Sequence, residues 1–109
     1  MLSLDRERPT NPKRFYLYPN YPNPFKSHTE FNFGVSEGVN VNFVIYNLAG
    51  EKVRSLINNK YFESGSYNFY WDARDDCGRR LSAGVYLYVF ELKSKNETKR
   101  LVEKIVLLK

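Results

Sequence analysis

The sequence predicts an all-β domain built as a two-layer sandwich of about seven strands. Aromatic residues make up 17% of the 109 residues, and aromatic side chains favour strands over helices. Apolar and polar residues alternate in several short segments, as they do in strands with one buried face. Turn-forming residues separate these segments at intervals of roughly 8–12 residues, which is typical of sandwiches. A chain of this length holds one domain with a single core.

The first 14 residues are polar and contain Pro9 and Pro12. This composition favours a linker, so residues 1–14 are predicted to be a tether and residues 15–109 the domain. Asp5 interrupts the N-terminus before any apolar stretch of the length that a signal peptide needs. No apolar run approaches the roughly 20 residues of a membrane span. We therefore expect no membrane insertion, and we expect any export signal to lie on a longer precursor.

Two predicted strands flank a proline-rich segment near the start of the domain. Residues 15–18 form a short extended piece that leads into three prolines within residues 19–25. Proline lacks a backbone donor and fixes φ, so this segment is expected to be rigid and to lie along a sheet edge. In residues 29–35 apolar and polar side chains alternate, which predicts a half-buried strand.

The middle of the chain predicts a hairpin and then a further strand. Residues 39–48 alternate up to a tight turn at Gly50, and residues 52–58 return from it. Val53, Leu56 and Ile57 in the returning segment would also suit a turn of helix. Residues 67–71 alternate again and end at Trp71, which we expect to fill the space between the two sheets.

The last two predicted strands follow a loop of turn-forming residues at 72–84. Residues 85–92 are almost wholly apolar, as expected of a central strand buried on both faces. Residues 97–108 fit a helix as well as a strand, because Leu101, Ile105 and Leu108 have helical spacing. Seven short segments with regular turns favour the strand. Together they predict an immunoglobulin-like sandwich.

The sequence offers few side chains for metal binding. Cys77 and His28 are the only residues of their kinds, so neither an internal disulfide nor the usual zinc sites can form, and Cys77 is expected to be an ordinary loop thiol. Asp72, Asp75 and Asp76 could bind calcium or act as an acid–base pair, but they lack the spacing of an EF-hand. Aspartates in a glycine-containing loop more often hold turns through side-chain-to-backbone hydrogen bonds.

Catalytic machinery is not evident either. Ser27 and His28 are neighbours, and on an extended chain their side chains point to opposite faces and cannot form a nucleophile–base pair. No glycine-rich phosphate-binding loop occurs in the sequence. The domain is therefore predicted to be non-enzymatic, with no metal and no cofactor.

Basic residues raise the alternative of nucleic-acid binding. The formal net charge is +5, and basic residues are concentrated from Lys93 onward. With Tyr86, Tyr88 and Phe90 they could form a stacking platform for nucleic acid. A solvated strand face is the other interpretation, and lysines also protect sheet edges from pairing. Because these aromatics alternate with aliphatic residues, one of the two sets must be core, and we expect no nucleic-acid partner.

An ordered set of motifs resembles a known family. Tyr21-Pro22-Asn23-Pro24-Phe25 resembles the sequence that opens C-terminal sorting domains of the type IX secretion system. These are similar to the Ig-like domain of flagellar hook-capping proteins. Further resemblances are the hairpin IYNLAGEKV at 45–53, the GSYNFYWD strand at 65–72, the stretch 76–88 and the closing KIVLLK at 104–109. Together the resemblance covers residues 15–109. The sequence departs from the family pattern at residues 26–28, which precede the usual threonine, and at position 73, where glycine is common.

The resemblance implies a non-catalytic sorting domain that directs an attached cargo through the type IX system to the cell surface. The domain would then be secreted or held at the outer surface, by way of the periplasm, as part of a larger precursor. Its implied partners are the secretion translocon or cell-surface proteins, and a terminal strand is easily reached by β-addition. The residues expected to carry recognition are Tyr21, Pro22, Asn23, Pro24, Phe25, Lys104, Val106 and Lys109.

Two other functions fit the same residues. One is a self-assembling extracellular or hook-cap-like structural subunit, which would associate with copies of itself. The other is a plain Ig-like accessory domain without a targeting role.

Overall fold

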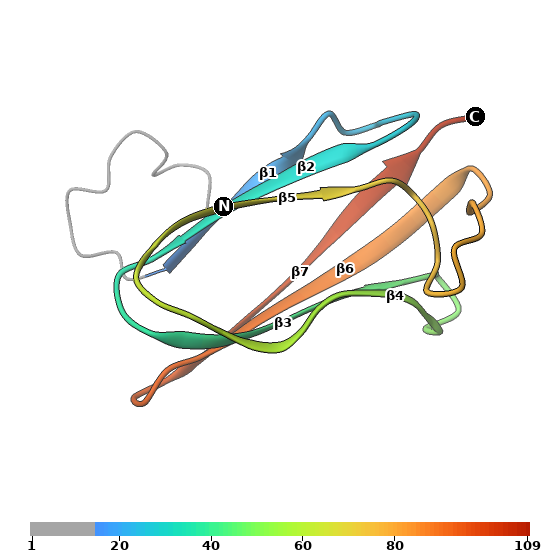
Figure 1. Ribbon diagram of the computed structural model, residues 1–109. Helices are drawn as coiled ribbons and strands as arrows, with labels where there is room; N and C mark the ends of the chain where they lie inside the picture. Colours follow the sequence, from blue (N-terminus) through green and yellow to red (C-terminus); the bar gives the residue numbers. More distant parts are fainter. Residues whose placement is uncertain (1–14) are drawn as a thin grey trace.

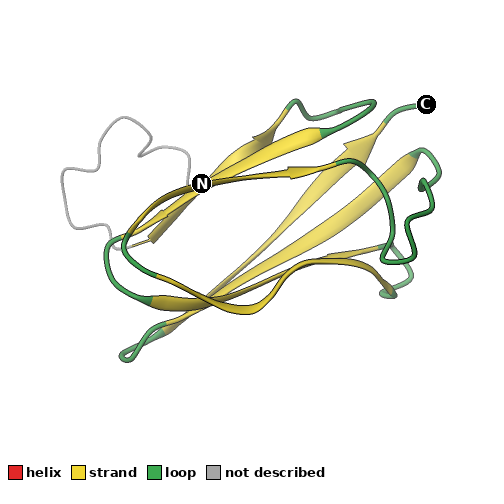
Figure 2. Ribbon diagram, in the orientation of Figure 1, coloured by secondary structure: helices red, strands yellow, loops and turns green. Residues whose placement is uncertain are grey.

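The computed structural model describes residues 15–109, so the tether predicted for residues 1–14 lies outside the described part of the chain. Within that part the chain forms seven strands and no helix (Figure 2). The strands make two antiparallel sheets that face each other (Figure 1). This arrangement confirms the predicted immunoglobulin-like two-sheet sandwich. No helix within residues 15–109 has the length and apolar character needed to cross a membrane.

The strands divide unequally between the two layers. One sheet has three strands in the order β1-β2-β5, and the other has four in the order β4-β3-β6-β7. Strands β1 and β5 are thus the edges of the first sheet, and β4 and β7 the edges of the second. The bounds are β1 (Phe15–Tyr21), β2 (Thr29–Val35), β3 (Val39–Tyr46), β4 (Lys52–Phe62), β5 (Gly65–Trp71), β6 (Gly84–Lys93) and β7 (Thr98–Leu107).

The C-terminal segment, whose sequence fitted a helix or a strand, is the strand β7. It pairs antiparallel with β6 along its whole length, from Thr98 opposite Lys93 to Leu107 opposite Gly84. The backbone hydrogen bonds of this pairing outweigh the helical spacing of the sequence, because propensity is a weak preference that tertiary context overrides. The other helix-like segment lies in β4, which continues past the expected end at residue 58 to Phe62.

Strand β6 is central in its sheet but is not buried on both faces, so that expectation was wrong. Tyr86, Tyr88 and Phe90 are buried toward the other sheet, whereas the aliphatic residues between them are half-buried on the outer face. The reason is that a two-layer sandwich covers only the inner face of each sheet. The three rings therefore cannot form the stacking platform considered for nucleic acid.

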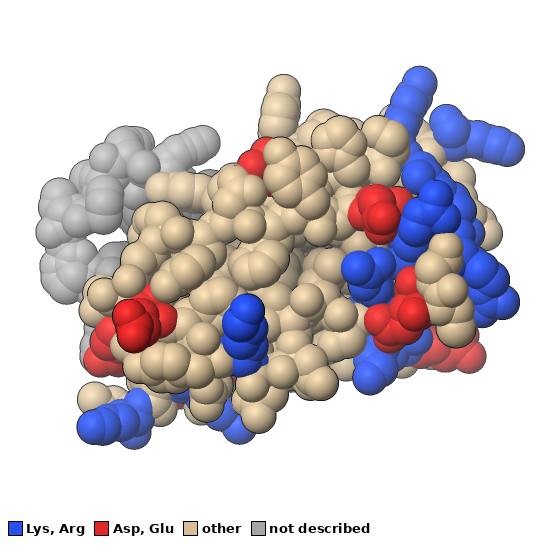
Figure 3. All heavy atoms as spheres, viewed as in Figure 1, with Lys and Arg blue, Asp and Glu red and all other residues tan. Residues whose placement is uncertain are grey.

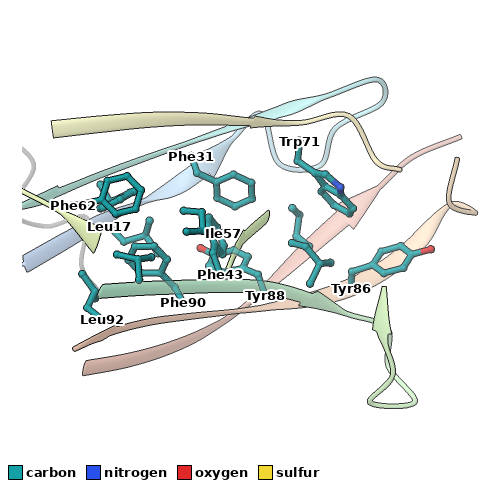
Figure 4. Close-up of a cluster of buried hydrophobic side chains, with 14 of the residues drawn as sticks. Leu17, Phe31, Phe43, Ile57, Phe62, Trp71, Tyr86, Tyr88, Phe90 and Leu92 are labelled. Atoms are coloured by element: carbon teal, nitrogen blue, oxygen red, sulfur yellow. The ribbon is translucent and has the colours of Figure 1, made fainter. Parts of the chain in front are cut away.

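The core between the sheets is built largely from aromatic rings (Figure 4). Phe31 of β2 meets Phe43 of β3 edge to face, with ring centroids 4.7 Å apart. Phe33 meets Phe90 in the same way at 4.9 Å. Such pairs contribute about 0.5–1.5 kcal/mol beyond the area they bury. The rings of the two layers thus interlock, and they fix β2 over β3 and β6.

Candidate recognition site

The structure brings together the two segments that the resemblance singled out. Residues 21–25, called here the signature segment, begin at the last residue of β1 and lie beside the C-terminal end of β7 (Figure 1). Phe25 and Leu107 form a parallel bridge between them. The signature segment therefore links the three-stranded sheet to the edge of the four-stranded sheet. Two regions about 80 residues apart in sequence form one surface.

Asn23 makes the side-chain contacts of this junction. Its Nδ2 donates to the backbone oxygen of Lys104 at 3.3 Å, and its Oδ1 accepts the N–H of Val106 at 3.0 Å. The amide thus supplies one donor and one acceptor, as a backbone peptide group does. In effect Asn23 replaces one residue of an additional strand along β7.

Phe25 continues the pairing through its backbone. Its N–H donates to the oxygen of Val106 at 2.9 Å, and its own oxygen accepts the N–H of Leu108 at 2.7 Å. The Phe25 side chain is buried and packs against Trp71, with ring centroids 5.7 Å apart. The end of the signature segment is therefore anchored in the core as well as to the sheet edge.

This pairing changes how the terminal strand can be recognised. We expected residues 104–109 to be open to β-addition, but Asn23 and Phe25 occupy the outward hydrogen-bonding groups of Val106 and the N–H of Leu108. That expectation was wrong for this end of β7, because the signature segment covers its edge. A receptor would meet side chains here rather than unpaired backbone.

Two buried residues that sequence reasoning missed hold the signature segment in shape. The Thr29 hydroxyl donates to the oxygen of Pro22 at 2.7 Å, and Asn20 Nδ2 donates to Thr29 Oγ1 at 3.0 Å. Asn20 and Thr29 are the buried polar residues of the described chain. Both X-Pro bonds of the segment, before Pro22 and Pro24, are cis. Asn20 is a polar residue two positions before Pro22, and this spacing was the feature of the sequence that could have indicated its role in the turn.

Arg80 ties the chain after the signature segment to the loop between β5 and β6. Its guanidinium donates to the backbone oxygens of Lys26, Ser27 and Asp72. One arginine therefore binds three carbonyls from two separate loops. Two of the three residues that depart from the family pattern, Lys26 and Ser27, are held in place by this contact.

The exposed side chains of the site are mainly basic and apolar. Tyr21 is 78% exposed and Leu108 42%, and Lys104 and Lys109 are exposed as well. A depression of about 350 Å³ beside the C-terminus is lined by Arg80, Leu81, Ser82, Ala83, Leu107, Leu108 and Lys109. Figure 3 shows Lys and Arg gathered at this end of the molecule. Such a surface suits a partner that offers carboxylates around an apolar contact.

The carboxylates of the β5–β6 loop are engaged in interactions that hold the loop. Asp75 Oδ1 accepts the N–H groups of Cys77 and Arg79, both at 2.9 Å, which is the turn-holding role expected of such a residue. Asp72 and Asp76 lie 3.6 and 3.9 Å from the guanidinium of Arg54. In the part of the chain that the structure describes, no group of three or more His, Cys, Asp or Glu is placed to hold a metal ion.

Ser27 and His28 do meet, contrary to the geometric argument from the sequence. Ser27 Oγ lies 3.2 Å from His28 Nδ1. That expectation was wrong because these residues lie in the bend before β2 rather than on an extended strand, so their side chains are not forced to opposite faces. The pair is exposed, and His28 packs on Tyr70 with ring centroids 5.6 Å apart.

Comparison with known proteins agrees with this architecture. The model of the FlgD Ig-like domain family matches residues 22–98. Dimeric latent PorU from Porphyromonas gingivalis superposes with a TM-score of 0.69 at 19% identity, covering 93% of this chain and 10% of PorU. FlgD from P. aeruginosa superposes with a TM-score of 0.56 at 21% identity, covering 74% of this chain and 67% of FlgD.

These structural matches show the fold alone, and the chain spans only about a tenth of the PorU chain. No curated protein sequence matches the chain. The family model, in contrast, covers well over half of the chain. It includes the signature segment from Pro22 to Phe25 and five of the seven strands, β2 to β6, and it ends at the first residue of β7. The chain therefore belongs to the FlgD Ig-like domain family.

Proposed function

We propose that this domain is a sorting domain that directs an attached cargo through the type IX secretion system to the cell surface. The family match supports a broader assignment, an Ig-like accessory domain of a typically non-catalytic family. The observation that carries the proposal is the junction of the signature segment with residues 104–108. The two segments that resemble sorting motifs are about 80 residues apart in sequence, yet hydrogen bonds join them into one surface.

The junction explains why both segments would be needed for recognition. Asn23 and Phe25 are committed to structure, so they position the surface rather than offer themselves to a receptor. Tyr21, Lys104 and Lys109 are exposed around it and are free of the core. We assign receptor contact to these three side chains and positioning to the other residues of the signature segment. The partner would be the translocon, and the destination the outer surface by way of the periplasm.

A charge-neutralising variant tests this function without unfolding the domain. Lys104→Gln with Lys109→Gln removes two exposed charges and leaves Ile105 and Leu107 to pack. Surface substitutions of this kind usually change stability by no more than about 0.5 kcal/mol. The matched control is Lys95→Gln with Lys99→Gln, which removes the same charge at the far hairpin between β6 and β7.

The domain would be fused to a periplasmic reporter in a host that has a type IX system. The wild-type fusion and the control variant should reach the cell surface, and the Lys104/Lys109 variant should accumulate in the periplasm. A wild-type fusion that never leaves the periplasm would contradict the sorting function. That result would favour the accessory-domain or self-assembling alternatives, which sedimentation of the purified domain would separate by its oligomeric state.

A further inference from the structure

The outer face of the three-stranded sheet carries an ordered array of tyrosine, amide and hydroxyl side chains. Its cross-strand rows are Tyr16–Gly34–Ser66, Tyr18–Asn32–Asn68 and Tyr21–Glu30–Tyr70. This face lies on the side of the sheet away from the core, and its side chains are exposed or half-buried. The proposed sorting function uses only Tyr21 of this face, at its edge on β1.

Tyr16 lies flat on this face because of the residue beside it. A Cβ at Gly34 would overlap the Tyr16 ring, so glycine leaves the space that the ring occupies. The Tyr16 hydroxyl reaches across to Ser66 Oγ on β5, 3.4 Å away. A ring held down along the sheet in this way presents its opposite, flat face to solvent. The face therefore has a flat aromatic surface at one end.

The middle of the face is a fixed row of hydrogen-bonding groups. Asn68 Nδ2 donates to Glu30 Oε2 and to Asn32 Oδ1, the latter at 2.8 Å. Because the Asn68 nitrogen is committed to these acceptors, its Oδ1 remains an acceptor and the Asn32 nitrogen remains a donor. Donors and acceptors are thus oriented by the sheet before any ligand arrives.

The far end of the face is aromatic again. Tyr70 on β5 is 62% exposed, and its ring is held against His28, with an interplanar angle of 31°. Aromatic rings consequently flank the amide row on both sides. Tyrosine suits this position because its ring is apolar while its hydroxyl can bond to a ligand.

Charge separates this face from the rest of the molecule. Strands β1, β2 and β5 contain one charged residue, Glu30, and no Lys or Arg, although the chain as a whole has a net charge of +5. In Figure 3 the upper left and upper middle of the view, where these strands lie, show no blue, and blue side chains begin only at the upper right. A polyanion would not be attracted here, and the chemistry fits a neutral polar ligand.

The size of the face selects a small ligand rather than a protein. The three strands together are about 10 Å wide, and the first and third cross-strand rows lie about 13 Å apart along a strand. A specific protein partner buries about 800 Å² on each side, several times more than this strip offers. A ligand of a few sugar rings matches the strip in length and width.

We propose that this face binds a neutral oligosaccharide. The apolar C–H faces of pyranose rings would stack on Tyr16 and Tyr70, and sugar hydroxyls would bond to Asn32, Asn68 and Glu30. A sugar ring has an apolar face surrounded by hydroxyl donors and acceptors. The apolar face matches the tyrosine rings, and the hydroxyls match the amide groups between them. None of the five residues proposed to bind sugar belongs to the recognition site, which borders this face only at Tyr21.

Titration of the whole chain with neutral hexasaccharides, followed by amide NMR, tests the proposal. The probes are cellohexaose, xylohexaose, mannohexaose and laminarihexaose. At least one should shift amides of β1, β2 and β5 selectively. Asn68→Ala and Tyr70→Ala should each weaken that binding by about tenfold, the effect of losing one hydrogen bond or ring contact.

Tyr61→Ala is the matched control, because Tyr61 is exposed to a similar degree, 60%, but lies on β4 of the other sheet. It should leave the affinity unchanged. Asn68 and Tyr70 are exposed, and equal unfolding midpoints of the variants would show that the fold is retained. The proposal is overturned if no hexasaccharide binds at millimolar concentration, if the shifts fall on the four-stranded sheet, or if Tyr61→Ala weakens binding equally.

Discussion

Trp71 occupies the end of the core that lies beneath the signature segment. Its ring packs against Phe25 and Tyr86, with centroids 5.7 and 6.4 Å away. Its Nε1 donates to the oxygen of Arg74 at 3.0 Å, so the polar edge of the indole is also satisfied. The side chain is 1% exposed, which confirms the position predicted from the alternation of residues 67–71. One residue thus supports the core, the signature segment and the start of the β5–β6 loop.

Replacing Trp71 by alanine should therefore be among the most damaging single substitutions. We expect a loss of about 3–5 kcal/mol in the free energy of unfolding, because a large cavity opens between the sheets. Urea denaturation of the two proteins measures this difference. The neighbouring substitution Tyr70→Ala, on the exposed face, should change stability by no more than about 0.5 kcal/mol. Equal losses for the two variants would contradict the account of the core.

The carboxyl group of Asp75 makes the free energy of unfolding depend on pH at the acid side. The N–H of Arg79 is the largest influence lowering the pKa of Asp75 below its usual value of 3.8, and the N–H of Cys77 and the Arg79 charge act in the same direction, against an opposing effect of desolvation. The unfolded chain then binds a proton more readily than the folded one. The contribution of Asp75 is complete above pH 3.8 and is lost as the pH falls through the folded-state pKa.

The matching experiment compares the wild type with Asp75→Asn. The stability difference between them should be largest near neutral pH and should shrink on acidification to about pH 2. Chemical unfolding at a series of pH values measures it. A difference that does not vary with pH would show that the carboxylate charge is unimportant to the loop.

At the scale of elements, the signature segment acts as a very short extra strand along β7. Asn23 supplies both hydrogen-bonding groups where a neighbouring strand would supply a peptide group, and Phe25 pairs through its backbone. An edge strand with unpaired backbone groups promotes aggregation unless it is covered. The signature segment therefore also protects the terminal part of β7.

Substitution of Asn23 should open this end of β7 to solvent. In Asn23→Ala the Val106 amide loses its acceptor, so its hydrogen exchange should accelerate relative to the amides that pair with β6. In Asn23→Asp a side-chain oxygen remains to accept the Val106 N–H, so protection of that amide should be retained. Amide exchange measured by NMR distinguishes the two variants. Fast exchange of Val106 in the wild type would argue against the junction.

Strand β6 gives the domain a second dependence on pH, at the alkaline side. Burial raises the pKa of Tyr88 above its usual value of 10.0, and the negative charge of Glu103 acts in the same direction. Burial also raises the pKa of Tyr86. The folded state therefore holds these protons more tightly than the unfolded chain. The contribution of these two protonated hydroxyls to stability is fully present below pH 10.0 and is lost as the pH rises above it.

Tyr88→Phe removes one of these titrating groups while it keeps the ring in the core. Between about pH 9 and pH 11 the variant should lose less free energy of unfolding than the wild type. Denaturant unfolding at both pH values provides the measurement. An equal loss in both proteins would mean that other groups cause the alkaline instability.

At the scale of the whole molecule, a single aromatic core joins the two sheets that residues 15–109 form. The sequence predicts that residues 1–14 are a tether that contributes nothing to this core. Deleting residues 1–14 should then leave the midpoint of urea unfolding unchanged. A lower midpoint for the truncated chain would show that the N-terminal residues belong to the folded domain.

The sequence by itself determined the sandwich, because its evidence is local. Alternation of apolar and polar residues reports which face of a strand is buried, and it located Trp71 and the strands β2, β3 and β5 nearly to their ends. The motif resemblance also identified the signature segment and residues 104–109. Local patterns were insufficient for β6, whose apolar outer face suggested burial on both sides, and for β7, whose spacing also suited a helix.

Only the tertiary structure decided what those segments do together. Contact between Asn23 and β7 depends on how one sheet lies over the other, and a periodicity within either segment carries no information about that distance. The same holds for the tyrosine and amide rows, which require the register of three strands. Register and sheet packing are set by side chains that meet across long loops, so a sequence read residue by residue cannot reveal them.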